Sequence, residues 1–231
     1  QALYPHHRGG TPIAYLWLRS ARCAGPNCGI EVPLASKLWL AKKGQRHALL
    51  LKPHARRRSV DVEIVRPGSD ADVGPPTVRL GSMTCPVCGF TTKKDLVRAQ
   101  LAAAGGGVAG ARLACVVVTR EGERGRYFEA PSDADLHAVK KAAAQVAELL
   151  ASEAGSRLIP NEPIPQERVW KNNPVRVHLY GVRTWGDLFS PRQALAMASF
   201  VEAVRELPHA MAKEGADEAV TTATAACLSL A

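Results

Sequence analysis

Aromatic side chains and long apolar runs are both scarce in this sequence of 231 residues. Phe, Trp and Tyr make up only 5% of the chain, so we expect cores built from Ala, Val and Leu rather than aromatic clusters. No apolar run approaches the roughly 18 residues that a membrane-spanning helix needs. A basic-then-apolar signal segment is also missing. These absences predict a cytoplasmic protein without a membrane partner, folded as one large domain or two small ones.

Motifs for common enzyme chemistry are missing as well. The glycine run at 105–107 lacks the Lys-Ser/Thr tail of a phosphate loop, so we expect a flexible joint there rather than a nucleotide site. No Ser-His-Asp or Cys-His arrangement is legible. His6 and His7 have no carboxylate or cysteine at ligand spacing, which predicts a solvated terminal segment. We therefore assign no catalytic residue to this chain.

Acidic residues are scarce in the first third of the chain. The net charge is +9, and residues 1–68 carry 12 Lys and Arg against 3 Asp and Glu, so the whole excess lies there. Such asymmetry favours a polyanionic partner, most often nucleic acid, although a merely solvated basic surface is the alternative. The candidate DNA-binding residues crowd into one stretch: Lys42, Lys43, Arg46, Lys52, Arg56, Arg57 and Arg58.

Four of the six cysteines form two close pairs. Four residues separate Cys23 from Cys28 and two separate Cys85 from Cys88, and a glycine and a potential strand follow each pair. A tetrahedral zinc ion takes four thiolates at about 2.3 Å, which two tight turns supply in pairs. The glycines allow each turn to aim backbone amides at the sulfurs. The pattern predicts a zinc ribbon whose Zn²⁺ is structural, because no coordination position is left for a catalytic water.

Other interpretations of the cysteines exist. Two redox dithiols or four unrelated buried cysteines are alternatives, but the first pair lacks the strand–helix context of a redox motif. Iron in a rubredoxin-like site is a further alternative, and zinc is favoured because nothing in the sequence indicates redox chemistry. Cys115 and Cys227 stand alone among apolar residues, so we expect both to be buried.

Periodicity and capping signals predict an α+β fold, in which a zinc ribbon with inserted β-hairpins precedes a mainly helical part. We expect strands at 37–41, 46–52, 60–65, 113–119 and 126–129, and helices at 92–103, 132–152 and 190–207. Thr92, Ser132 and Ser190 are the expected caps of those helices. The apolar face expected for the second helix comprises Leu136, Val139, Ala143, Val146 and Leu150.

Three units follow from these elements. Residues 1–104 form a zinc-ribbon domain with a basic insertion, 108–157 a hairpin with a long helix, and 158–231 an extended connector with C-terminal helices. Neither end carries a natural start or stop signal, so we expect both ends to be cuts and the chain to be a piece of a longer protein, with its last helices truncated.

Motifs along nearly the whole chain resemble the adenine-specific DNA methylases that contain a zinc ribbon. They are Gly10-Thr11-Pro12-Ile13-Ala14-Tyr15-Leu16-Trp17, Cys85-Pro86-Val87-Cys88-Gly89-Phe90, Tyr180-Gly181, and Thr184-Trp185-Gly186-Asp187-Leu188-Phe189-Ser190-Pro191-Arg192-Gln193. The resemblance implies transfer of a methyl group from S-adenosylmethionine to adenine N6 in DNA. It also implies that a cofactor loop precedes this region and an Asp-Pro-Pro-Tyr catalytic motif follows it.

Neither of those two motifs occurs in these 231 residues. The resemblance therefore implies a DNA-positioning region inside a methyltransferase, with S-adenosylmethionine and catalysis supplied by the remainder of the methyltransferase chain. The spacing of the first cysteine pair is long for this pattern. A free-standing zinc-ribbon module that binds RNA or a protein partner is the alternative.

Overall fold

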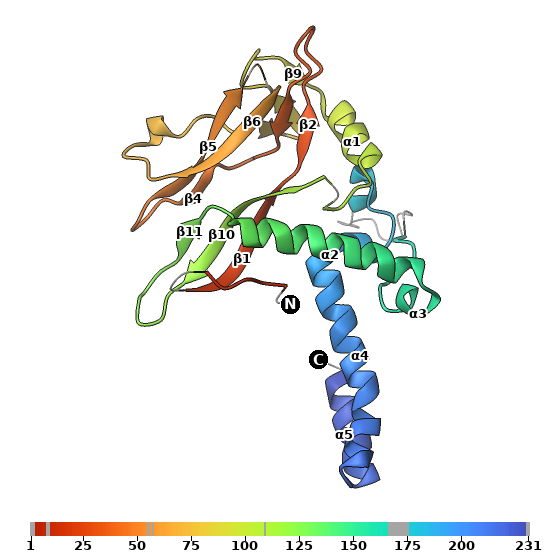
Figure 1. Ribbon diagram of the computed structural model, residues 1–231. Coiled ribbons are helices and arrows are strands. Elements are labelled where there is room, and N and C mark those ends of the chain that lie inside the picture. Colours follow the sequence, from red (N-terminus) through yellow and green to blue (C-terminus); the bar gives the residue numbers. More distant parts are fainter. Residues whose placement is uncertain are drawn as a thin grey trace, which may run out of the picture.

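The structure is a computed structural model, which describes residues 3–7, 10–54, 56, 58–108, 110–165 and 176–229 (Figure 1). It is 36% helix and 26% strand, with the strands in several small antiparallel sheets, which confirms the α+β class. In the described part of the chain, no helix is both long enough and apolar enough to cross a membrane.

The strands of the described residues fall into four antiparallel sheets. One holds β1 (Thr11–Leu18), β10 (Arg112–Thr119) and β11 (Tyr127–Glu129), and a second holds β2 (Ser20–Arg22) and β3 (Glu31–Pro33). A third holds β4 (Trp39–Ala41), β5 (His47–His54) and β6 (Ser59–Val65), and the last holds β7 (Val78–Arg79), β8 (Ser82–Thr84) and β9 (Thr91–Thr92). The strands expected from the sequence are confirmed, with ends shifted by one or two residues.

Strand β10 joins parts of the chain that are far apart in sequence. Its apolar run is buried almost throughout, and it pairs with β1 on one side and β11 on the other. Leu113, Val116 and Val118 pack against Trp17 of β1 and against Val139 of helix α2. Residues 1–104 and 108–157 therefore share one sheet, while the predicted limits of the three units remain a prediction.

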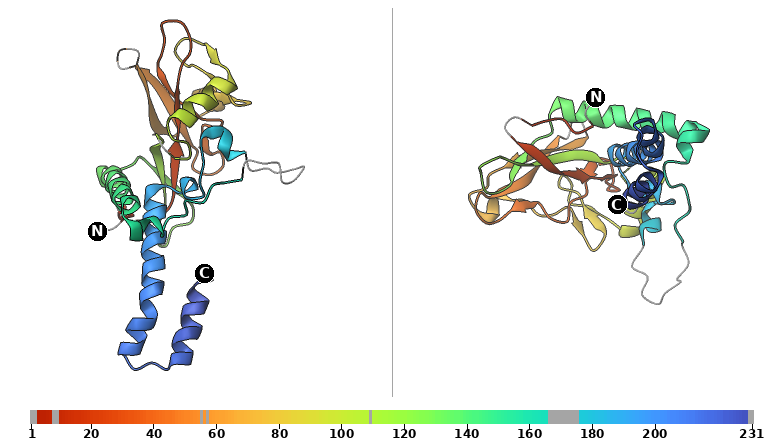
Figure 2. Two further views of the ribbon diagram at one scale, coloured as in Figure 1. Left: turned by 90° about the vertical axis from the view of Figure 1, so that its right-hand side faces the viewer. Right: turned by 90° about the horizontal axis from the view of Figure 1, so that it is seen from below.

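The helices are α1 (Lys94–Ala103), α2 (Asp133–Ala151), α3 (Glu153–Ser156), α4 (Pro191–Lys213) and α5 (Glu218–Ser229), together with the short 3₁₀ turns η1 (Asp70–Asp72), η2 (Val177–Tyr180) and η3 (Gly186–Leu188). The capping boxes predicted at Ser132 and Ser190 are both formed. Helix α4 was expected to end at Leu207, but it continues through Pro208 to Lys213, and α5 packs alongside it. The two helices extend away from the sheets (Figure 2).

The buried face of α2 differs from the predicted one. Asp135, Ala138 and Ala142 are buried, whereas Leu136 and Leu150 are 41% and 46% exposed. The small alanines let the helix lie close to its neighbours. Several of the larger side chains instead line an apolar hollow of about 430 Å³ next to Ile159, Pro160 and Phe189.

His7 packs against the body of the protein, so the prediction of a solvated segment is wrong for His7, whereas His6 is exposed as predicted. The His7 ring is 5% exposed and bridges two carboxylates, Nδ1 to Glu129 at 3.1 Å and Nε2 to Asp135 at 3.0 Å. The same segment also contacts Arg192, whose guanidinium lies over the ring of Tyr4 at 4.8 Å and over the ring of Tyr15 of β1 at 4.0 Å. Glu129 and Asp135 are more than 100 residues from His7 in the sequence, so the spacing of neighbouring residues could not predict these contacts.

Burial lowers the pKa of His7, but the hydrogen bonds to Asp135 and Glu129 outweigh it and hold the pKa above its ordinary 6.5. A raised folded-state pKa contributes stability that is complete below pH 6.5 and is lost as pH rises through the folded value. We therefore expect the His7→Gln substitution to destabilise the protein more at pH 6 than at pH 8.5, in urea unfolding followed by circular dichroism. The exposed His209→Gln is the control. An equal loss at both pH values would contradict a protonated His7.

Candidate metal centre

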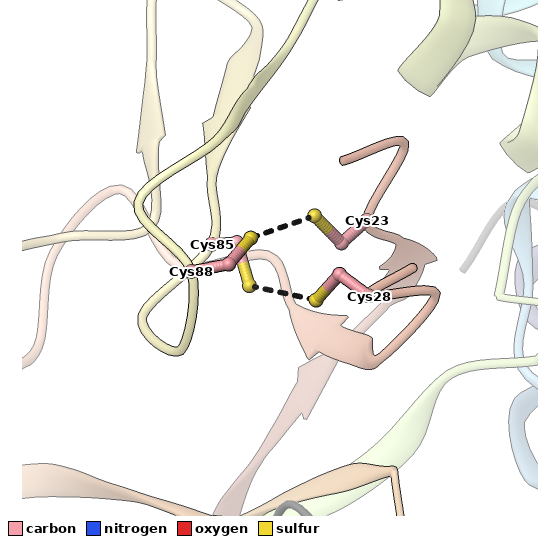
Figure 3. A group of neighbouring side chains, drawn as sticks. All are labelled: Cys23, Cys28, Cys85 and Cys88. Carbon is pink, nitrogen blue, oxygen red and sulfur yellow. Dashed lines mark hydrogen bonds between the residues drawn. The ribbon is translucent and has the colours of Figure 1, made fainter. Parts of the chain in front are cut away.

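Two hairpins of similar design carry the four cysteines. Cys23 and Cys28 lie in the loop between β2 and β3, and Cys85 and Cys88 lie in the loop between β8 and β9 (Figure 3). Each loop is closed by the same bond: the amide of Cys23 donates to the carbonyl of Ile30 at 2.9 Å, and that of Cys85 to Phe90 at 3.0 Å. In both cases the acceptor is two residues beyond the second cysteine, so the longer first loop has the same closure.

Glycine has the role expected of it in both loops. Gly29 and Gly89 have φ of +58° and +73°, in the left-handed region that favours glycine. The amides one residue further on, at Ile30 and Phe90, hydrogen-bond the sulfurs of Cys28 and Cys88. In the first loop Gly25 also donates its amide to Cys23 Sγ at 3.3 Å. Amides aimed at sulfur stabilise the thiolate form that a metal ion requires.

The four sulfurs converge on one point. All lie within 4.8 Å of one another, and the two contacts between the loops are Cys23–Cys88 at 3.5 Å and Cys28–Cys85 at 3.8 Å (Figure 3). All four cysteines are free, and these separations are far longer than the roughly 2.05 Å of a disulfide. Four thiolates placed tetrahedrally at about 2.3 Å from a zinc ion lie about 3.8 Å apart. This group could therefore hold a metal ion.

The thiols differ in their surroundings. Burial raises the pKa of Cys23 to about 12. The amide of Ile30 lowers the pKa of Cys28, but burial and the neighbouring Cys88 thiol outweigh it and leave that pKa raised. The amide of Phe90 lowers the pKa of the exposed Cys88 to about 7. Near neutral pH, Cys23 is therefore deprotonated only when a cation binds, and binding releases its proton.

Contacts that the sequence did not indicate join the first hairpin to β9 and to α1. Gln100 of α1 makes a pair of hydrogen bonds with the backbone of Arg22, accepting at 2.7 Å and donating at 3.0 Å. The hydroxyl of Thr92 accepts a hydrogen bond from the amide of Ala24 at 3.1 Å. The prediction that Thr92 caps α1 is therefore wrong: the N-cap residue is Lys93, which makes no side-chain capping bond. At Gly25 a Cβ would lie 2.9 Å from Phe90 of the other loop, which requires glycine there.

The core of this region includes two of the four clustered cysteines. Cys23 and Cys85 are buried in one cluster with Met83 of β8 and with Val97 and Leu101 of α1. Cys115 is buried as expected, but the expectation that Cys227 is buried is wrong: α5 packs against α4, and Cys227 is exposed on it. The isolated cysteines thus lie apart from the site.

The structure separates the candidate DNA-binding residues into two groups. Lys42, Lys43 and Arg46 lie at the β4–β5 turn, and Arg56 and Arg58 follow the far end of β5, whose eight residues span about 26 Å. Lys52 lies on the strand between them, and Arg57 lies outside the described residues. These residues therefore do not form one compact patch.

Ion pairs distinguish these residues further. Arg46 contacts Asp70 at 2.7 Å, Lys42 approaches the same carboxylate at 3.9 Å, and Lys52 pairs with Glu63 at 2.6 Å. Arg46 and Lys42 also lie over the Trp39 ring, at 4.9 and 5.3 Å. Internal acids thus offset part of the basic excess on which the DNA-binding prediction rests.

Comparisons of the chain with protein-family models, with curated proteins and with solved structures find no significant match. The resemblance to the zinc-ribbon adenine methylases therefore rests on the sequence motifs alone.

Proposed function

We propose that Cys23, Cys28, Cys85 and Cys88 bind one structural zinc ion, and that the region they stabilise positions DNA for an adenine-N6 methyltransferase. The convergence of four free thiols within 4.8 Å carries the metal part of this proposal. Four thiolates complete a tetrahedral shell and leave no open position for substrate or water. The zinc ion then joins two hairpins that are otherwise too small to be stable alone.

DNA is the favoured partner because of the charge of the region around the site. The whole +9 excess lies in residues 1–68, and the exposed Lys43, Arg56 and Arg58 form no ion pair with the described residues. Contacts from such side chains to phosphates would orient a duplex without reading its sequence. S-adenosylmethionine and the catalytic residues are assigned to the remainder of the methyltransferase chain, in line with the resemblance.

The test uses the gene that encodes this chain. The reading frame around it should encode a cofactor loop upstream and an Asp-Pro-Pro-Tyr motif downstream. Its full product should transfer labelled methyl groups from S-adenosylmethionine to adenine in duplex DNA, whereas the 231 residues alone should neither transfer methyl groups nor bind the cofactor in calorimetry. A frame without these motifs, and a chain that prefers RNA or a protein partner to duplex DNA, would favour the free-standing module instead.

A further inference from the structure

Two hairpin turns, distant in sequence, enclose a basic groove. The β4–β5 turn contributes Lys43 and Gly44, and the β10–β11 turn contributes Arg124, Gly125 and Arg126 to a hollow of about 460 Å³. Both turns lie on the same side of the molecule (Figure 1). The basic surface expected within residues 1–68 does not include the two arginines of the second turn.

Packing beneath the groove fixes the two turns relative to each other. The ring of His47 on β5 lies 5.3 Å from the ring of Phe128 on β11. His47 is 4% exposed, and its Nδ1 lies 2.9 Å from the carbonyl oxygen of Gln45 in the β4–β5 turn. Phe128 is held in register opposite Val117 of the buried strand β10. The groove is thus formed by a rigid base and two short turns.

The groove has a concentration of uncompensated positive charge. Lys43, Arg124 and Arg126 are exposed and form no ion pair with the described residues, and no acidic side chain lines the hollow. Of the nearby acids, Glu123 accepts a hydrogen bond from the hydroxyl of Tyr127, and Glu129 pairs with Arg120 and His7. Three cations that share one hollow repel one another unless an anion lies between them.

We propose that this groove binds the phosphodiester backbone of a nucleic acid. The planar guanidinium groups of Arg124 and Arg126 can each donate two parallel hydrogen bonds to phosphate oxygens. The ammonium group of Lys43, on the opposite turn, adds a further positive charge. Gly44 and Gly125 have no side chain to obstruct the approach of the nucleic-acid backbone. The apolar side chains of Leu40 and Phe128 can pack against its deoxyribose rings. This inference rests on the proposed DNA-positioning function and locates its principal phosphate contacts.

The test is the salt dependence of binding to a fluorescein-labelled 20-base-pair duplex, measured by fluorescence anisotropy. The triple variant Lys43→Ala, Arg124→Ala, Arg126→Ala should bind more than about tenfold more weakly at low salt, and its log–log salt slope should flatten by about 2 to 3. A charge-matched control replaces Lys140, Arg205 and Lys213 by Ala, all exposed on α2 and α4, and should retain both values. Equal thermal melts of the two variants would show that both are folded.

The outcomes separate the groove from the wider function. If the wild-type chain binds the duplex but the groove variant keeps its affinity and slope, the groove is not the phosphate site, and the proposed function survives. If the wild-type chain binds neither duplex nor single-stranded DNA, the DNA-positioning function fails. Tighter binding of a poly-glutamate peptide than of the duplex, lost in the groove variant, would overturn the nucleic-acid assignment.

Discussion

Replacement of Cys85 by serine is expected to release the metal and to unfold the two cysteine hairpins. Cys85 is 1% exposed and shares a core cluster with Met83 and Val97, so loss of the metal reaches α1 as well. Structural zinc in small modules contributes on the order of 10–16 kcal/mol, which matches or exceeds the roughly 5–15 kcal/mol stability of a typical domain. Elemental analysis should find no bound zinc, and hydrogen exchange should show lost protection over at least residues 11–92.

The matched control is Cys227→Ser, because Cys227 is exposed on α5 and takes no part in the cluster. That variant should keep the wild-type metal content, melting temperature and exchange pattern. A Cys85→Ser protein that retains one metal ion per chain and its hydrogen-exchange protection would contradict the assignment of Cys85 as a ligand.

Replacement of Gly106 by alanine is expected to destabilise the protein strongly. Gly106 has φ of +71°, and a Cβ there would lie 2.1 Å from the carbonyl carbon of Gly181 and 2.5 Å from the amide nitrogen of Val182. Both neighbours are backbone atoms, which cannot turn aside as a flexible side chain would. We expect a loss of about 3–5 kcal/mol in the free energy of unfolding, from left-handed strain and overpacking together.

Gly122→Ala separates these two causes. Gly122 has a similar φ of +75°, but nothing lies within 4 Å of a Cβ built on it. That variant should lose only the roughly 1–2 kcal/mol that left-handed backbone costs an L-residue. The measurement is urea unfolding of both variants with metal present. Equal losses would show that the contact between Gly106 and Gly181 relaxes without cost.

The features that depend on a few adjacent residues, such as turns, helix caps and single strands, were predicted from the sequence. The cysteine spacing with Gly29 and Gly89 predicted two turns that face one another, because a tight turn and a left-handed glycine are properties of a few adjacent residues. The capping boxes at Ser132 and Ser190 were predicted for the same reason. The strand predicted over 60–65 is present as β6 for a similar reason, since alternating apolar residues are a local property of the sequence.

Features formed by long-range contacts were not accessible from the sequence. The glycine run at 105–107 was predicted to be a flexible joint, but Gly106 packs against the backbone of Gly181. His7 was expected in solvent, but strand β11 and helix α2 bring it two carboxylates. The sequence did not indicate that Arg124 lies near Lys43, because their proximity depends on how two hairpins pack against each other.

Native mass spectrometry of the wild-type chain, after expression with zinc and removal of loosely bound metal, tests whether the four cysteines hold a metal ion. We predict one zinc ion per chain, released by acid or a strong chelator together with loss of hydrogen-exchange protection around Cys23 and Cys85. Cobalt substitution should then give the visible absorption of tetrahedral thiolate coordination. A fully folded chain that carries neither zinc nor iron, and takes up no cobalt, would show that the four cysteines are not a metal site.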